Sequence, residues 1–157
     1  MNEVEVIYCA SHSHIGETLT ANYLRHHLPI GSVLVNYYMP NPPGTLEIDL
    51  VVVNTNGVYL LEVKHWVGAI EADQVRWRHS SGDLRDSPIV TVEYKARVMH
   101  GFLKDRGWER VSVVGLVVLS KGTGTLHSTD PNTHKVFGMH ETLIKALTGC
   151  EYVHPHK

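Results

Sequence analysis

The sequence predicts an α/β domain in which helices flank a mixed central sheet. Three observations favour this class. Residues 46–66 consist of two β-rich apolar runs around a turn cluster, as a hairpin does. Residues 15–27 and 88–106 carry apolar side chains at helical spacing. Residues 111–119 are almost wholly apolar, which is typical of a central strand covered on both faces.

Local signals mark each predicted element. Residues 11–14, Ser-His-Ser-His, can cap the first helix. Pro88 suits the start of the second helix, and Gly107 suits its end. In chain order we predict a short strand in 1–10, a helix in 15–27, a strand in 32–38, a proline-rich loop in 39–44, the hairpin in 46–66, a weaker strand in 67–78, a polar loop in 79–87, a helix in 88–106, a strand in 111–119, a loop in 121–133, a short strand in 134–138 and a short helix in 139–147.

Length and composition indicate one globular domain. A chain of 157 residues can bury a sizeable core, and 43% hydrophobic with 19% charged residues is ordinary for such a domain. The net charge of −2 provides no general basic field for tight non-specific DNA binding. Cys9 and Cys150 make no disulfide framework, so we expect a reducing, cytoplasmic location. No apolar run predicts a membrane span.

The hairpin contains charged residues that strands of this kind rarely bury. Because side chains alternate along a strand, Glu47 and Asp49 share one face of the first strand, and Glu62 and Lys64 share one face of the second. The opposite face of the first strand then holds Leu46, Ile48, Leu50 and Val52. Charged groups are seldom buried unless they pair or bind a metal.

The register of the hairpin decides whether these charges meet. A four-residue loop over residues 54–57 places Asp49 opposite Glu62, and the same register places Glu47 opposite Lys64. Directly opposed Cβ atoms lie about 4.5–5.5 Å apart, so two carboxylates can share a divalent cation. A two-residue Asn-Gly turn would instead place Asp49 opposite Lys64, and a one-residue slip would separate the acids. We expect the first register, because it builds a site.

This ordered set resembles a known family. Asp49 followed by Glu-x-Lys at residues 62–64 resembles the PD-(D/E)XK nuclease superfamily, and the wider pattern is similar to the NERD (nuclease-related) domain. The wider pattern comprises Gly16-Glu17, Glu47-Ile48-Asp49, the run from Gly57 to Gly68, Trp77, Ser87-Pro88 and Lys95-Ala96-Arg97. Where many relatives have Gln shortly after the proline, this chain has Thr91.

The resemblance implies a fold and a domain organisation. The expected core is α-β-β-β-α-β, with a mixed central sheet flanked by helices. Residues 1–157 would form a single nuclease domain. Relatives often precede a kinase or helicase domain, so this chain is either a whole protein or the N-terminal module of a longer one.

The resemblance also implies metal-dependent hydrolysis of DNA phosphodiester bonds. Asp49, Glu62 and the backbone carbonyl of Val63 would hold Mg²⁺ or Mn²⁺. Glu17 would help through water or a second ion. Lys64 would orient or deprotonate the attacking water and would hold the phosphate, so Lys64, Glu62, Asp49 and Glu17 are the expected catalytic residues.

Three residues keep two interpretations each. Glu17 lies on the core-facing stripe of the first helix, as a site acid would, but a first-turn Glu also complements the helix dipole. Lys95 could reach a phosphate or the active site, or it could be a solvated lysine whose stem covers the apolar stripe of its helix. Glu47 could support the site, or it could simply pair with Lys64.

Other functions remain open alongside the nuclease. The hairpin charges could form a cross-strand ion-pair ladder on an exposed face. The domain could then be a catalytically silent nucleic-acid-binding module, or an interaction or sensing domain attached to a kinase or helicase. The intact set of Asp49, Glu62 and Lys64 favours the nuclease. The 12 histidines show no zinc-site spacing, and the Gly-Thr-Gly at residues 122–124 lacks the lysine of a nucleotide-binding loop.

Overall fold

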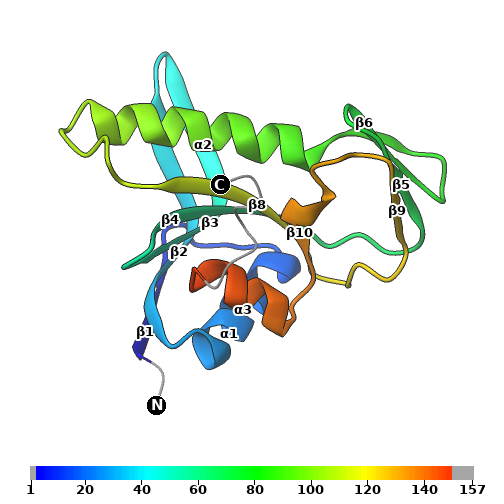
Figure 1. Ribbon diagram of the computed structural model, residues 1–157, viewed down its shortest axis with the longest axis horizontal. Coiled ribbons are helices and arrows are strands. Elements are labelled where there is room, and N and C mark those ends of the chain that lie inside the picture. The colour runs from blue at the N-terminus through cyan, green and yellow to red at the C-terminus, as the bar shows by residue number, and fades with distance from the viewer. Residues whose placement is uncertain (1–2, 150–157) are drawn as a thin grey trace.

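The computed structural model describes residues 3–149 (Figure 1). Cys150 and the two histidines at 154 and 156 lie outside the described residues. The elements are β1 (Glu3–Tyr8), α1 (Ile15–His27), β2 (Ile30–Asn41), β3 (Gly44–Asn54), β4 (Gly57–Lys64), β5 (Ile70–Ala72), β6 (Arg76–His79), β7 (Leu84–Asp86), α2 (Pro88–Lys104), β8 (Val113–Leu119), β9 (Leu126–Ser128), η1 (Thr133–Lys135), β10 (Val136–Phe137) and α3 (Glu141–Leu147). In this part of the chain, no helix combines the length and apolar character that crossing a membrane requires.

Six strands form the central sheet, in the order β1-β2-β3-β4-β8-β10. Strands β2, β3 and β4 pair antiparallel, whereas β8 runs parallel to β4 because α2 carries the chain back between them. Helices α1 and α3 cover one face and α2 covers the other (Figure 1). The predicted mixed sheet and the order helix, three strands, helix, strand are confirmed as α1-β2-β3-β4-α2-β8.

Two apolar cores fill the two sides of the sheet. Leu61 of β4 belongs to the same buried cluster as Leu24 of α1. Leu60, its neighbour in sequence, belongs with Met99 of α2 on the opposite side. Because β4 is covered on both faces, its sequence is continuously apolar until it reaches the charged residues at its end.

The hairpin register is the one predicted from the sequence. Val53 pairs with Val58, and Asn54 with Gly57, so the turn itself is tighter than expected. The β3–β4 ladder ends at the pair Leu50–Leu61. The next residues in this register are Asp49 and Glu62, which therefore stand where the two strands stop pairing.

The regular alternation predicted for β3 is wrong at one point. Leu46 and Ile48 lie with the core beneath α2, whereas Leu50 and Val52 lie with the core beneath α1. The change of side occurs at Asp49. Strand β2 provides the physical reason, because the residue facing Asp49 there leaves the extended conformation, as described below.

Three segments predicted as loops contain strands. β2 continues to Asn41, and Pro42-Pro43, joined by a cis peptide bond, forms the turn into β3. The polar segments 79–87 and 121–133 contain β7 and β9, which join β5 and β6 in a second sheet of order β7-β6-β5-β9. β7 and β9 have three residues each, too few to show a period, so their pairing with distant strands decides their conformation.

Candidate active site

Three carboxylates converge where the N-terminal turn of α1 meets the middle of β3. Glu17, Glu47 and Asp49 each offer one oxygen, and these three oxygens lie within 4.8 Å of one another. Glu17 and Asp49 are buried, with 3% and 8% of their surfaces exposed, whereas Glu47 is exposed. Carboxylate oxygens are the ligands that hard divalent cations take in proteins, so this donor set fits Mg²⁺ or Mn²⁺.

Glu17 lies in the first turn of α1 and also reaches the acidic cluster, so its position is compatible with both interpretations. Its Oε1 accepts the backbone N–H of His14 at 3.0 Å, so it caps α1, and the same carboxylate belongs to the acidic cluster. Gly16 brings the helix close enough for this. A Cβ at Gly16 would lie 3.0 Å from both His65 Cβ and Ser120 Oγ, so α1 packs directly against the ends of β4 and β8.

Asp49 is tied to the partner strand through its side chain. Its Oδ2 accepts the backbone N–H of Val63 at 2.8 Å. Burial, and next the charge of Glu62, raise the pKa of Asp49 to about 7, although the Val63 hydrogen bond acts in the opposite direction. Without a cation, Asp49 is therefore partly protonated at neutral pH.

Glu62 lies between two lysines. Lys95 Nζ is 3.0 Å from Glu62 Oε1, and Lys64 Nζ is 3.4 Å from Glu62 Oε2. The Lys95 side chain is only 13% exposed, so it reaches the site from α2 instead of extending into solvent. Glu62 is outside the three-carboxylate cluster, but its charge acts on Asp49 and links the acidic side of the site to the lysines.

The expected pairing of Glu47 with Lys64 is wrong. In the described residues no ion pair joins them, since Lys64 pairs with Glu62. Glu47 pairs in register with Tyr38 on the other neighbour of β3. A hydrogen bond to Glu47 raises the pKa of the Tyr38 hydroxyl. The reason is the end of the β3–β4 ladder at Leu50, beyond which Glu47 lies with β2.

Asn36 of β2 is a candidate site residue that the sequence did not identify. It is 4% exposed and has a φ of 57°, the one positive value among the described non-glycine residues. Its Nδ2 donates to Glu17 Oε1 at 2.9 Å. An Asn within an apolar strand sequence is unusual, and Asn tolerates the left-handed conformation better than most residues, so a weak sequence signal existed.

A cavity of about 310 Å³ opens beside the acidic cluster. Glu17 and Lys64 line it together with Trp66. The Trp66 ring is held edge-on by His79 at a centroid distance of 4.4 Å, and Lys64 Nζ lies 5.6 Å from the ring centroid. One carboxylate of the cluster, a lysine and an aromatic side chain therefore share one opening to solvent.

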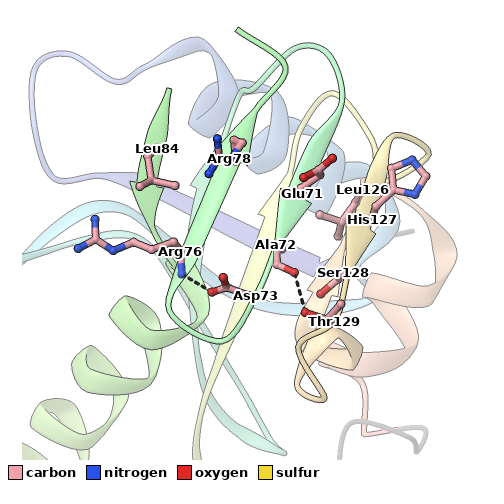
Figure 2. Close-up of a pocket in the computed structure, with 10 residues that line it drawn as sticks. All are labelled: Glu71, Ala72, Asp73, Arg76, Arg78, Leu84, Leu126, His127, Ser128 and Thr129. Carbon is pink, nitrogen blue, oxygen red and sulfur yellow. Dashed lines mark hydrogen bonds between the residues drawn. The ribbon is translucent and has the colours of Figure 1, made fainter. Parts of the chain in front are cut away.

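A second cavity, of about 670 Å³, lies on the outer face of the small sheet (Figure 2). Its walls combine Arg76 and Arg78 with Glu71 and Asp73. Asp73 is engaged in its own turn, where Oδ1 accepts the backbone N–H of Arg76 at 2.7 Å. This cavity shares no residue with the acidic cluster, and its opposite charges lie side by side, so we do not assign the candidate site to it.

Comparison with protein-family models matches residues 12–120 to the nuclease-related domain. The matched segment runs from the residues before α1 to the end of β8 and includes every candidate site residue. Searches of curated proteins and of solved structures gave no significant match. Membership implies a nuclease-related function and interaction with nucleic acid, and nucleases of the PD-(D/E)XK type generally use divalent metals. Because the match covers more than half of the chain, the protein belongs to the nuclease-related domain (NERD) family, within the PD-(D/E)XK-like nuclease superfamily.

Proposed function

We propose that this protein is a divalent-metal-dependent nuclease that hydrolyses DNA phosphodiester bonds. The observation that supports it is the arrangement of charges at the end of the β3–β4 hairpin. An acidic cluster with two buried members, Glu17 and Asp49, lies next to Glu62, which contacts two lysines. Negative groups that hold a cation, beside positive groups that hold a phosphate, are what phosphodiester hydrolysis requires.

In this proposal the chain supplies the ligands of the metal. Asp49, Glu62, the Val63 carbonyl and Glu17 would hold Mg²⁺ or Mn²⁺, with Glu47 in support. When bound, the ion supplies stabilisation of the anionic transition state and an increased acidity of water. The donor set fits this ion, since oxygens of Glu17, Glu47 and Asp49 lie within 4.8 Å of one another and hard divalent cations take carboxylate oxygens.

The lysines would act on the substrate and on the attacking water. Lys64 is 32% exposed and lines the cavity that opens beside Glu17, so it can contact a phosphate that enters. It would orient the attacking water or, in its neutral form, accept the proton of that water. Lys95 is more buried, and it would hold Glu62 in place while its charge favours the phosphate.

The setting of this activity is also a proposal. Residues 1–157 would act as one nuclease module, alone or in front of a kinase or helicase domain. The free and exposed Cys9 would stay reduced in the cytoplasm.

A cleavage assay tests the function. Supercoiled DNA, linear DNA and RNA would be incubated with the protein and either EDTA, Mg²⁺ or Mn²⁺. We expect metal-dependent cleavage of DNA by the wild type and none by Lys64→Ala. Lys104→Ala is the matched control, because Lys104 is an exposed lysine at the far end of α2. Binding of DNA without cleavage by the wild type would instead favour the silent binding module.

A further inference from the structure

We infer that Asn36 is a positioning residue for the metal-binding carboxylates: its amide group fixes the orientation of Glu17, and its carbonyl oxygen completes the polar lining of the cation site. This inference rests on the proposed function, because it concerns the same site. Asn36 comes from β2, an element to which the sequence assigned no part of the site.

The backbone places Asn36 at the centre of the site. The β2–β3 ladder passes from the pair Val35–Leu50 to the pair Tyr37–Ile48, so Asn36 stands opposite Asp49. At this point the ladder is interrupted, since Asn36 has a φ of 57°. Left-handed residues other than glycine are uncommon, and they persist where the surrounding structure requires them. The interruption turns the Asn36 side chain toward Glu17 and α1.

The amide group determines which oxygen of Glu17 is available. Asn36 Nδ2 and the His14 backbone N–H both donate to Glu17 Oε1, at 2.9 and 3.0 Å. Two donors at one oxygen hold the carboxylate in one orientation and leave Oε2 for a cation. The opposite orientation of the amide would direct one acceptor at another, so the assignment of Nδ2 to Glu17 follows from the chemistry of the pair.

The carbonyl oxygen of the Asn36 amide indicates a ligand that the protein itself does not provide. Asn36 Oδ1 is buried, and it has no hydrogen-bond partner among residues 3–149. The large majority of buried side-chain polar atoms are paired in native proteins, so an unpaired carbonyl oxygen on the side chain that contacts Glu17 indicates a missing partner. A divalent cation, or water that accompanies it, would complete the environment of this oxygen.

Direct Mn²⁺ binding, followed by the electron paramagnetic resonance signal of free Mn²⁺, tests the inference without relying on cleavage. Asn36→Gly removes the amide but keeps a residue that accepts the left-handed backbone. We expect this variant to bind Mn²⁺ about 10–100-fold more weakly than the wild type, as loss of a residue that orients a metal ligand typically does. Asn41→Gly, the same change at the end of the same strand, is the matched control and should bind as the wild type does.

A double-mutant cycle separates positioning from general damage. If Asn36 acts mainly through Glu17, Asn36→Gly should lower Mn²⁺ affinity by a clearly smaller factor in a Glu17→Gln background than in the wild type, because the group it orients is already lost and only the contribution of its carbonyl oxygen remains. Equal losses in both backgrounds, wild-type affinity in Asn36→Gly, or loss of the folded state in Asn36→Gly would each overturn the inference. If the wild type itself binds no Mn²⁺, the proposed function fails, and the inference fails with it.

Discussion

The backbone N–H of Val63 donates a hydrogen bond to Asp49 Oδ2 across 2.8 Å. This bond lies just beyond Leu50–Leu61, the last pair of the β3–β4 ladder. The Asp49 side chain therefore takes the place that a backbone carbonyl would have in a continuous sheet. As a result, one carboxylate is attached by a hydrogen bond to the segment of β4 that holds Glu62 and Lys64.

Substitution of the three central residues should abolish metal-dependent DNA cleavage. We expect Asp49→Ala and Glu62→Ala to reduce cleavage to its level in EDTA. Lys64→Ala should also abolish detectable cleavage, since the loss of an acid–base group lowers a rate by on the order of 10²–10⁴-fold. Glu47→Ala should cost less, because that side chain is exposed. The measurement is single-turnover cleavage by folded variants, with Glu71→Ala on the small sheet as control. Wild-type rates in all three central variants would show that the site is assigned wrongly.

The metal-free protein should lose stability as the pH rises. The Asp49 carboxyl has an ordinary pKa of 3.8 and a pKa of about 7 in the folded protein, so the folded state holds the proton more tightly. This contribution is fully present below about pH 4 and is lost as the pH rises through 7. Urea unfolding in EDTA should give a free energy of unfolding about 2–3 kcal/mol lower at pH 8 than at pH 5 from this group.

Asp49→Asn isolates that contribution. Its side-chain oxygen can still accept the Val63 N–H, but it carries no charge, so the stability of this variant should depend less on pH. An unchanged pH dependence in Asp49→Asn would mean that other groups cause the effect.

Mg²⁺ or Mn²⁺ should raise the melting temperature at neutral pH. A cation that binds only the folded state adds about 2.7 kcal/mol at a hundredfold excess over Kd. The effect should shrink as the pH falls, because protonated carboxylates are poor ligands. Asp49→Asn should melt higher than the metal-free wild type and should not respond to metal. Melting curves of the wild type and of Asp49→Asn, in EDTA and in millimolar metal, measure these effects. The absence of any metal-dependent shift in the wild type would contradict a metal site.

Lys95→Met should destabilise the protein more than Lys64→Met. Both lysines contact Glu62, but the Lys95 side chain is 13% exposed and that of Lys64 is 32% exposed. Lys95→Met removes the more buried partner of Glu62 and leaves that carboxylate poorly solvated. We therefore expect the free energy of unfolding to fall by about 2 kcal/mol in this variant. Lys64→Met breaks the more exposed pair and should lower the free energy of unfolding by less than about 1 kcal/mol. Urea unfolding in EDTA compares the two, with Lys104→Met as control, and an inverse order would show that Lys64 is the main partner.

Local pattern was enough to predict the framework of the site. α1 begins and ends where the sequence indicated, because a capping segment precedes it and a proline follows. The hairpin register followed from the two strands and the turn between them. Glu62 and Lys64 lie on the α2 side of β4, two residues apart, since alternation along a strand is a local property.

The rest depended on contacts between segments far apart in the chain. Asn36 meets Glu17 only because Gly16 lets α1 pack against β4 and β8, while a left-handed residue interrupts β2. Lys95 reaches Glu62 because α2 crosses the sheet at that level. The sequence of α2 alone was equally compatible with a Lys95 side chain in solvent. The sequence by itself therefore determined which charged residues lie on which element. The tertiary structure decided their partners, because a charge pairs with its nearest neighbour in space, and packing between distant segments sets that neighbour.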